Sequence, residues 1–222
     1  MELEAWSNLE TFFLAEKAVT GTIPNCFAQM SALSSFAVHG LLLTGTVPPK
    51  LWENPKLFVL DISKNPGLMG TLPTEIGLAT ALNSLIAYEN DSWSGTVPSE
   101  TGLLTSLEHV LINESNLSGT LPSEVAGLSN LIWVLIDGNP LTGTVPLNAA
   151  NSQQLVHLQM NSTLLTGEVP ESACGVDPLH FDCPQLCGCD CQCADSSNEL
   201  LSDTATVCTR KMLKRMIVFV SI

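Results

Sequence analysis

The sequence predicts an α/β repeat solenoid, a single elongated domain of stacked coils with short strands on one side. The first observation is a repeated Gly-x-x-Pro tetrapeptide whose copies lie 24 or 25 residues apart. A period of this length over most of a chain is typical of solenoids, and it takes precedence over a domain count based on length. Two further observations are apolar residues at fixed places in each repeat and cysteines concentrated near the C-terminus. The tetrapeptides begin at Gly21, Gly45, Gly70, Gly95, Gly119, Gly143 and Gly167.

Each repeat is expected to start with a short strand that buries one face. In the best-formed copy, Val134 and Ile136 are separated by one residue, which places both side chains on the same face of a strand. Pairing between coils would join these strands into a parallel sheet on the concave side. Three more apolar residues are expected to point into the same core from the rest of the coil: Leu131, Leu141 and Val145.

The glycine and the proline of each tetrapeptide form a corner of the coil. Gly143 allows the backbone to turn where a side chain would clash, because glycine has no Cβ. Pro146 fixes φ and has no N–H to donate, so it ends the local strand pairing. We interpret the tetrapeptide as architecture.

The complete frame, L-x-x-V-x-I-x-x-N-x-L-x-G-x-V-P from Leu131 to Pro146, resembles the plant-type leucine-rich repeat (LRR). Repeats of this type occur in receptor ectodomains and secreted inhibitor proteins, and in algal lineages. The resemblance covers about three quarters of the chain. It implies a right-handed, L domain-like stack of about seven coils that binds a partner and has no enzymatic activity.

The convex side is expected to carry 3₁₀ or short helical turns. The segments 73–82 and 122–131 each have Ser or Thr followed by Glu, a pair that favours a helix start. The extra residue of the two longer coils is expected in the turn-type sequences 65–68 and 90–93.

The Asn of the frame is expected to bond buried backbone groups where the chain turns inward. Its amide is present in only some coils, so this ladder is degenerate. The occupants are Lys17, Leu41, Asn65, Asn90, Ser115, Asn139 and Thr163.

The charge balance argues against nucleic acid and anionic lipid as partners. The chain has 22 acidic and 8 basic residues, a net charge of −14, and no Lys or Arg lies between Lys64 and Arg210. Such a surface repels phosphate groups. Motifs for a nucleophile elbow, a phosphate-binding loop or a metalloprotease are absent from the sequence. We therefore expect no catalytic residue, no metal ion and no cofactor.

Recognition is expected on the concave sheet, where unburied strand positions form rows about 4.8 Å apart per coil. The row that contains His109, Trp133 and His157 would expose a tryptophan between two histidines. Apolar positions lie beside it, and interfaces favour aromatic anchors in such settings. The predicted partner-binding residues are Tyr88, His109, Leu111, Trp133, Leu135 and His157. Their partner would be a protein, a peptide or a glycan, and the alternative is that these are tolerated surface residues.

N-glycosylation is predicted at Asn113, Asn116 and Asn161, which all begin N-x-S/T sequons. The sequon at Asn90 occupies the buried ladder position and is expected to be unmodified. Glycans at Asn113 and Asn161 would crowd the recognition surface. They would favour a rival interpretation, a structural or cell-wall coat glycoprotein.

The C-terminal cysteines are expected to form a disulfide-tied cap over the last coil, because a solenoid end exposes an apolar coil that must be covered. We place the repeats at residues 1–170, the cap at 171–208 and a basic and apolar tail at 209–222. The pairing remains open among the fifteen connectivities that six cysteines allow. The C-x-C spacing also resembles thiolate metal clusters, so a second rival is an intracellular acidic scaffold with a metal site. The predicted disulfide cysteines are Cys174, Cys183, Cys187, Cys189, Cys191 and Cys193.

An extracellular or cell-surface location is expected from the cysteine cap and the sequons. The opening residues fit the repeat and do not resemble a signal peptide, so the chain is expected to begin inside a longer array. The apolar run 216–222 is much shorter than the roughly 20 residues of a membrane-spanning helix. Cys26 is expected to be an inert, partly buried thiol.

Overall fold

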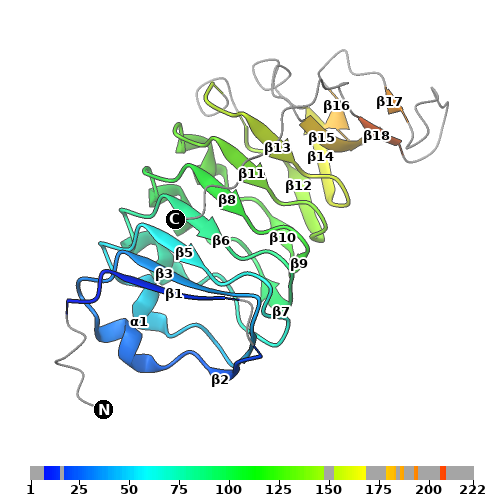
Figure 1. The fold of residues 1–222 in the computed structure, drawn as a ribbon. Coiled ribbons are helices and arrows are strands. Elements are labelled where there is room, and N and C mark those ends of the chain that lie inside the picture. The colour runs from blue at the N-terminus through cyan, green and yellow to red at the C-terminus, as the bar shows by residue number, and fades with distance from the viewer. Residues whose placement is uncertain are drawn as a thin grey trace.

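A computed structural model describes residues 8–15, 18–147 and 153–168, together with the backbone of the strand residues 179–183, 186–187, 193–194 and 206–208. The chain forms a column of stacked coils with an extended sheet along one side (Figure 1). The predicted repeat solenoid is therefore confirmed.

The concave side is a ten-stranded sheet in the order β1-β3-β5-β6-β8-β11-β13-β15-β18-β17. Neighbours from β1 to β15 pair in parallel, because each coil contributes one strand in the same direction. The last two strands, β18 and β17, pair antiparallel. The strand bounds are β1 Thr11–Ala15, β3 Ser35–His39, β5 Val59–Asp61, β6 Ser84–Ile86, β8 His109–Leu111, β11 Trp133–Leu135, β13 His157–Gln159, β15 Leu179–Cys183, β17 Cys193–Ala194 and β18 Thr206–Cys208.

A second set of strands carries the Gly-x-x-Pro corners along a side of the coils (Figure 1). Gly95 has φ of +85°, and a Cβ there would lie 2.6 Å from Cγ2 of Thr71 in the preceding coil. The predicted clash is thus real, and threonine of one coil packs over glycine of the next. The bounds are β2 Thr20–Thr22, β4 Leu42–Thr44, β7 Asn90–Gly95, β9 Ser115–Leu117, β10 Gly119–Thr120, β12 Leu141–Thr144, β14 Leu164–Glu168 and β16 Leu186–Cys187.

The extra residue of one longer coil lies where it was predicted. The pairing of β7 with β9 runs from Asn90 opposite Ser115 to Ser94 opposite Asn116, with a register shift between them. Turn-type residues 90–93 absorb the additional length as a bulge.

Short turns cover the convex side, as predicted for 73–82 and 122–131. The expected start signal is different, because proline takes the N-cap position and no side chain caps the turn. Thr74 and Ser123 instead donate to the carboxylate of the following glutamate, each at 3.2 Å. The turns are η2 Asn25–Gln29, α1 Pro49–Trp52, η3 Thr74–Leu78, η4 Ser99–Leu103 and η5 Ser123–Gly127.

The buried ladder joins neighbouring coils through side-chain amides. Asn90 Oδ1 accepts a hydrogen bond from the backbone N–H of Asn65 at 2.9 Å, and Asn90 Nδ2 donates to the carbonyls of Ile62 and Ala87. Asn139, two coils later, donates in the same way to the carbonyls of Ile112 and Ile136, and its Oδ1 accepts from the backbone N–H of Leu117. Leu41, which has no amide, is buried at the same place. Lys17 lies outside the described residues.

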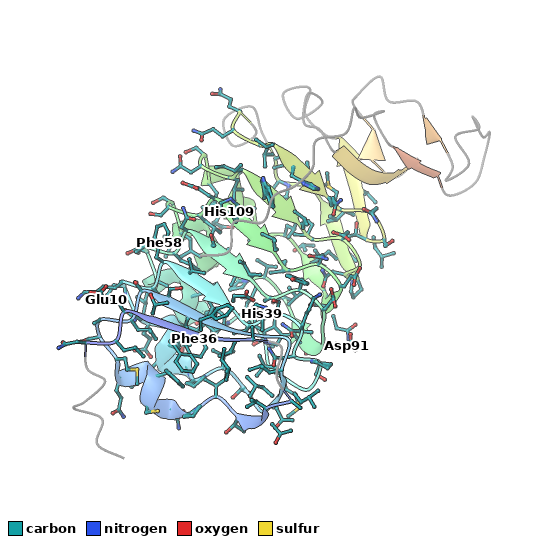
Figure 2. The ribbon with its side chains drawn as sticks, in the orientation of Figure 1. Glu10, Phe36, His39, Phe58, Asp91 and His109 are labelled. Atoms are coloured by element: carbon teal, nitrogen blue, oxygen red, sulfur yellow. The ribbon has the colours of Figure 1, made fainter. Side chains whose placement is uncertain are left out.

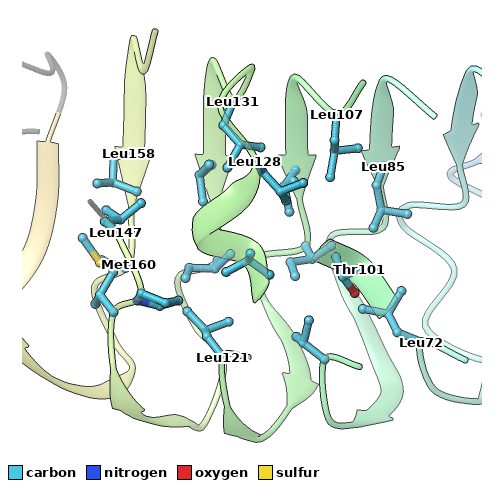
Figure 3. A pocket seen from close by; sticks show the side chains of 18 residues that line it. Leu72, Leu85, Thr101, Leu107, Leu121, Leu128, Leu131, Leu147, Leu158 and Met160 are labelled. Carbon is cyan, nitrogen blue, oxygen red and sulfur yellow. The ribbon is translucent and has the colours of Figure 1, made fainter. Parts of the chain in front are cut away.

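The core is closed in the middle coils and looser toward the C-terminal end. Leu60 and Leu85 are fully buried on the inner face of the sheet, whereas Val110 and Val134 at the equivalent positions are only partly buried. Both valines line a cavity of about 70 Å³, together with Leu85 and other apolar side chains (Figure 3). Val145 also lines this cavity, so Val134 and Val145 face the core as expected, although each is only partly buried.

Candidate functional site

The six predicted partner-binding residues lie on or just after the concave strands. We call them the concave patch: Tyr88, His109, Leu111, Trp133, Leu135 and His157. Trp133 pairs with His109 on β8 and with His157 on β13. Leu135 pairs with Leu111 in the adjacent row. The sequence register is thus reproduced, because strands one repeat apart pair without a shift; Figure 2 marks His109 on this sheet.

The aromatic row is in contact but is less exposed than expected. The Trp133 ring lies 5.8 Å from the His109 ring and 5.7 Å from the His157 ring, measured between centroids. Trp133 is partly buried and His157 is 9% exposed. The tryptophan that was expected to be exposed is therefore partly buried, since the two imidazole rings pack against it. Leu111 and Leu135 are partly buried beside them.

A series of side-chain hydrogen bonds holds the His109 ring. Ser84, opposite His109 on β6, has its Oγ 3.2 Å from His109 Nδ1. The same hydroxyl donates to Asn83 Oδ1 at 3.0 Å, and Asn83 Nδ2 donates to the Ser106 carbonyl. Burial lowers the pKa of His109, while the neighbouring Glu108 carboxylate opposes this and raises the pKa. The net shift favours neutral imidazole near pH 7.

The shifted pKa predicts how stability depends on pH. Between the lowered pKa of folded His109 and the ordinary value of 6.5, the unfolded chain binds more protons than the folded chain. The free energy of unfolding should therefore fall as the pH falls through this window. His109→Gln should show a shallower fall between pH 7.5 and 5 than the unsubstituted protein, measured as the urea midpoint at each pH. Parallel curves for the two proteins would contradict this assignment.

Tyr88 lies at the other end of the concave patch and has a charged neighbour. Lys64 Nζ lies 5.5 Å from the Tyr88 ring centroid and 3.6 Å from Glu89 Oε1. Lys64 and Glu89 both have positive φ, at 56° and 53°, which places them at the tight bend before the ladder position. Tyr88 is partly buried by this arrangement.

A second cluster at the N-terminal end of the sheet was not singled out from the sequence. His39 Nδ1 lies 3.4 Å from Asp61 Oδ2, and Asp61 Oδ1 accepts from the Ser63 hydroxyl at 2.6 Å. The exposed Phe13 ring meets the His39 ring edge to face. The carboxylate lies between the serine and the histidine, so His39 does not activate Ser63, which is fully buried. Rows of strand positions contain these residues, but their rotamers could not be read from the sequence.

The sequon residues occupy different surfaces. Asn113 and Asn161 follow β8 and β13 on the concave side and are partly buried. Asn116 is exposed on β9, and its amide donates to the Asp91 carbonyl. Asn90 is fully buried in the ladder. Glycosylation at these positions stays a prediction.

The cysteine cap lies largely outside the described residues. Cys26, the one cysteine whose side chain is described, is a free and partly buried thiol. The disulfide predictions at Cys174, Cys183, Cys187, Cys189, Cys191 and Cys193 concern side chains that are not described. Within residues 8–15, 18–147 and 153–168, no group of three or more His, Cys, Asp or Glu residues is placed to hold a metal ion. None of the helices in this described part is both long and apolar enough to cross a membrane.

The repeated coil, parallel sheet and 3₁₀ turns define a plant-type leucine-rich repeat protein. No protein-family model matches the sequence, and no curated protein matches it. Solved structures do match: the PEPR1–AtPEP1 complex is 28% identical with a TM-score of 0.71, over 76% of this chain and 23% of that chain. The Arabidopsis receptor kinase HAESA ectodomain with an extended IDA peptide hormone is 25% identical with a TM-score of 0.71, over 79% and 29%.

A third match is the plant peptide hormone receptor RGFR1 with RGF2, 28% identical with a TM-score of 0.67, over 76% of this chain and 27% of that chain. The chain thus spans 23% to 29% of the length of these three structures. The HAESA structure contains a peptide hormone ligand, and RGFR1 is named as a peptide hormone receptor. The comparisons support a ligand-binding LRR module.

Proposed function

We propose that this chain is a non-enzymatic binding module, outside the cell or at its surface, whose concave patch binds a peptide or an extended protein segment. The observation that carries the proposal is the patch itself, with Trp133 between two histidines and Leu111 and Leu135 beside them. Aromatic anchors among partly buried apolar side chains are typical of interface centres. Structural neighbours that hold peptide hormones support the same class of partner.

Different residues of the concave patch offer different kinds of contact to a ligand. Leu111 and Leu135 offer apolar area in adjacent strands, and Trp133 offers a large rigid ring. The histidines add hydrogen-bonding groups at both sides of that ring. In the polar cluster around Asp61, the carboxylate accepts from both the backbone N–H and the hydroxyl of Ser63, which is consistent with a scaffold without catalysis.

Trp133→Ala is expected to weaken binding of a selected peptide by at least about thirtyfold, the effect of losing an interface anchor worth about 2 kcal/mol or more. Peptides would be selected on immobilised protein from a displayed library, and their Kd measured by calorimetry. Leu103→Ala is the matched control, because Leu103 is 58% exposed on the convex side. Peptides that bind both variants as well as the original protein would remove the patch from the binding site.

A further inference from the structure

The hydrogen bonds from Asn83 through Ser84 to His109 determine which ring nitrogen of neutral His109 carries the proton. Asn83 Oδ1 can only accept a hydrogen bond, and it lies 3.0 Å from Ser84 Oγ. The donation of Asn83 Nδ2 to the Ser106 carbonyl supports this orientation of the amide. Ser84 has one hydroxyl proton, so that proton points to Asn83.

The direction of the Ser84–His109 hydrogen bond follows from that of the Ser84–Asn83 hydrogen bond. With its proton engaged, Ser84 Oγ can only accept from His109 Nδ1, which lies 3.2 Å away. Neutral His109 must then carry its proton on Nδ1, and Nε2 keeps a lone pair. Free histidine in water favours the opposite tautomer. Within the described residues no side chain or backbone group is found bonded to Nε2, so this acceptor is available to a ligand.

The surroundings of this acceptor favour a positive charge. The Glu108 carboxylate acts electrostatically on the His109 ring, and the Trp133 ring contacts the His109 ring with 5.8 Å between centroids. Tryptophan rings attract cations at their faces. No Lys or Arg lies between Lys64 and Arg210 in the sequence, whereas this interval contains many carboxylates. A ligand nitrogen that donates and is charged would complement all three groups.

We propose that His109, with Trp133 and Glu108, forms a subsite for a cationic N–H donor of a peptide ligand, a lysine or arginine side chain or an N-terminal ammonium. Ser84 and Asn83 are positioning residues that keep Nε2 as the acceptor. This inference rests on the proposed function and narrows the ligand to peptides with a positive charge opposite His109.

The tautomer is tested first, without any ligand. Ring ¹⁵N shifts of His109 at pH 7.5 are expected to show protonated Nδ1 and unprotonated Nε2. Ser84→Ala should move His109 toward the Nε2–H tautomer. Ser35→Ala, at the row position paired with Val59 and away from His109, should leave it unchanged. A His109 that is Nε2–H in the unsubstituted protein would overturn the proposal.

The ligand class is tested with peptides selected on the unsubstituted protein from a random displayed library. We expect lysine or arginine at one fixed position in the selected peptides, and a loss of about tenfold or more in affinity when it becomes citrulline or norleucine. Ser84→Ala should reduce that loss. Peptides that need Trp133 but contain no required basic residue would overturn this inference and leave the proposed function standing. A library that yields no binder would instead contradict the proposed function.

Discussion

Replacing Asn139 with leucine is expected to lower the free energy of unfolding by about 3–5 kcal/mol. The Asn139 amide donates to the carbonyls of Ile112 at 2.8 Å and Ile136 at 3.0 Å, and its Oδ1 accepts from the Leu117 amide at 3.0 Å. Leucine has the same number and branching of side-chain heavy atoms but leaves these buried groups unpaired, at about 1–3 kcal/mol each. Urea unfolding followed by circular dichroism measures the loss.

Serine at position 139 supplies the control. Ser115 occupies the ladder in the preceding coil and still donates to the Ala87 carbonyl at 3.3 Å. Asn139→Ser should therefore cost less than Asn139→Leu, and Ser115→Asn should raise stability by up to about 1 kcal/mol. If leucine at 139 were as stable as asparagine, the ladder would not hold the coils together; Leu41 shows that one coil is built without it.

The sequence was sufficient to predict the coil and its register. The 24- or 25-residue spacing places Ser84, His109, Trp133 and His157 in one row, and the strand pairs confirm each step. It also located the bulge at 90–93, since turn residues there are the easiest place to absorb an extra residue. Period and residue type carry this information because every coil repeats the same contacts with its neighbours.

Side-chain depth and rotamers could not be predicted in the same way. Trp133 is partly buried because two imidazole rings pack against it, a contact between three separate coils. The pattern of the repeat counts valine as equivalent to leucine, yet Val110 and Val134 are only partly buried where Leu60 and Leu85 are buried. The Ser84–His109 bond depends on the torsions of two side chains, which no periodicity fixes.

Gly102→Ala is expected to destabilise the protein by about 1–3 kcal/mol, the usual cost of adding a methyl group to a packed interface. A Cβ at Gly102 in η4 would lie 2.5 Å from Cβ of Glu124 and 2.8 Å from its carbonyl carbon and oxygen in η5. Backbone cannot move aside as a flexible side chain can, so the two turns must separate. The urea midpoint and amide exchange of Leu104 and Leu128, whose N–H groups close these turns, measure the effect.

Gly127→Ala is the matched control, because Gly127 also lies in a 3₁₀ turn, but a Cβ there meets nothing within 4 Å among the residues that the structure describes. It should change stability by less than about 1 kcal/mol, and in the stabilising direction if the backbone accepts alanine. Equal losses for both substitutions would mean that glycine matters only for the conformation of the turn.

The chain from η4 continues into β8 and the chain from η5 into β11, which carry His109 and Trp133. Separation on the convex side should therefore tilt these strands, and a change in the His109 ring resonances in Gly102→Ala but not in Gly127→Ala would show that convex packing sets the geometry of the concave patch.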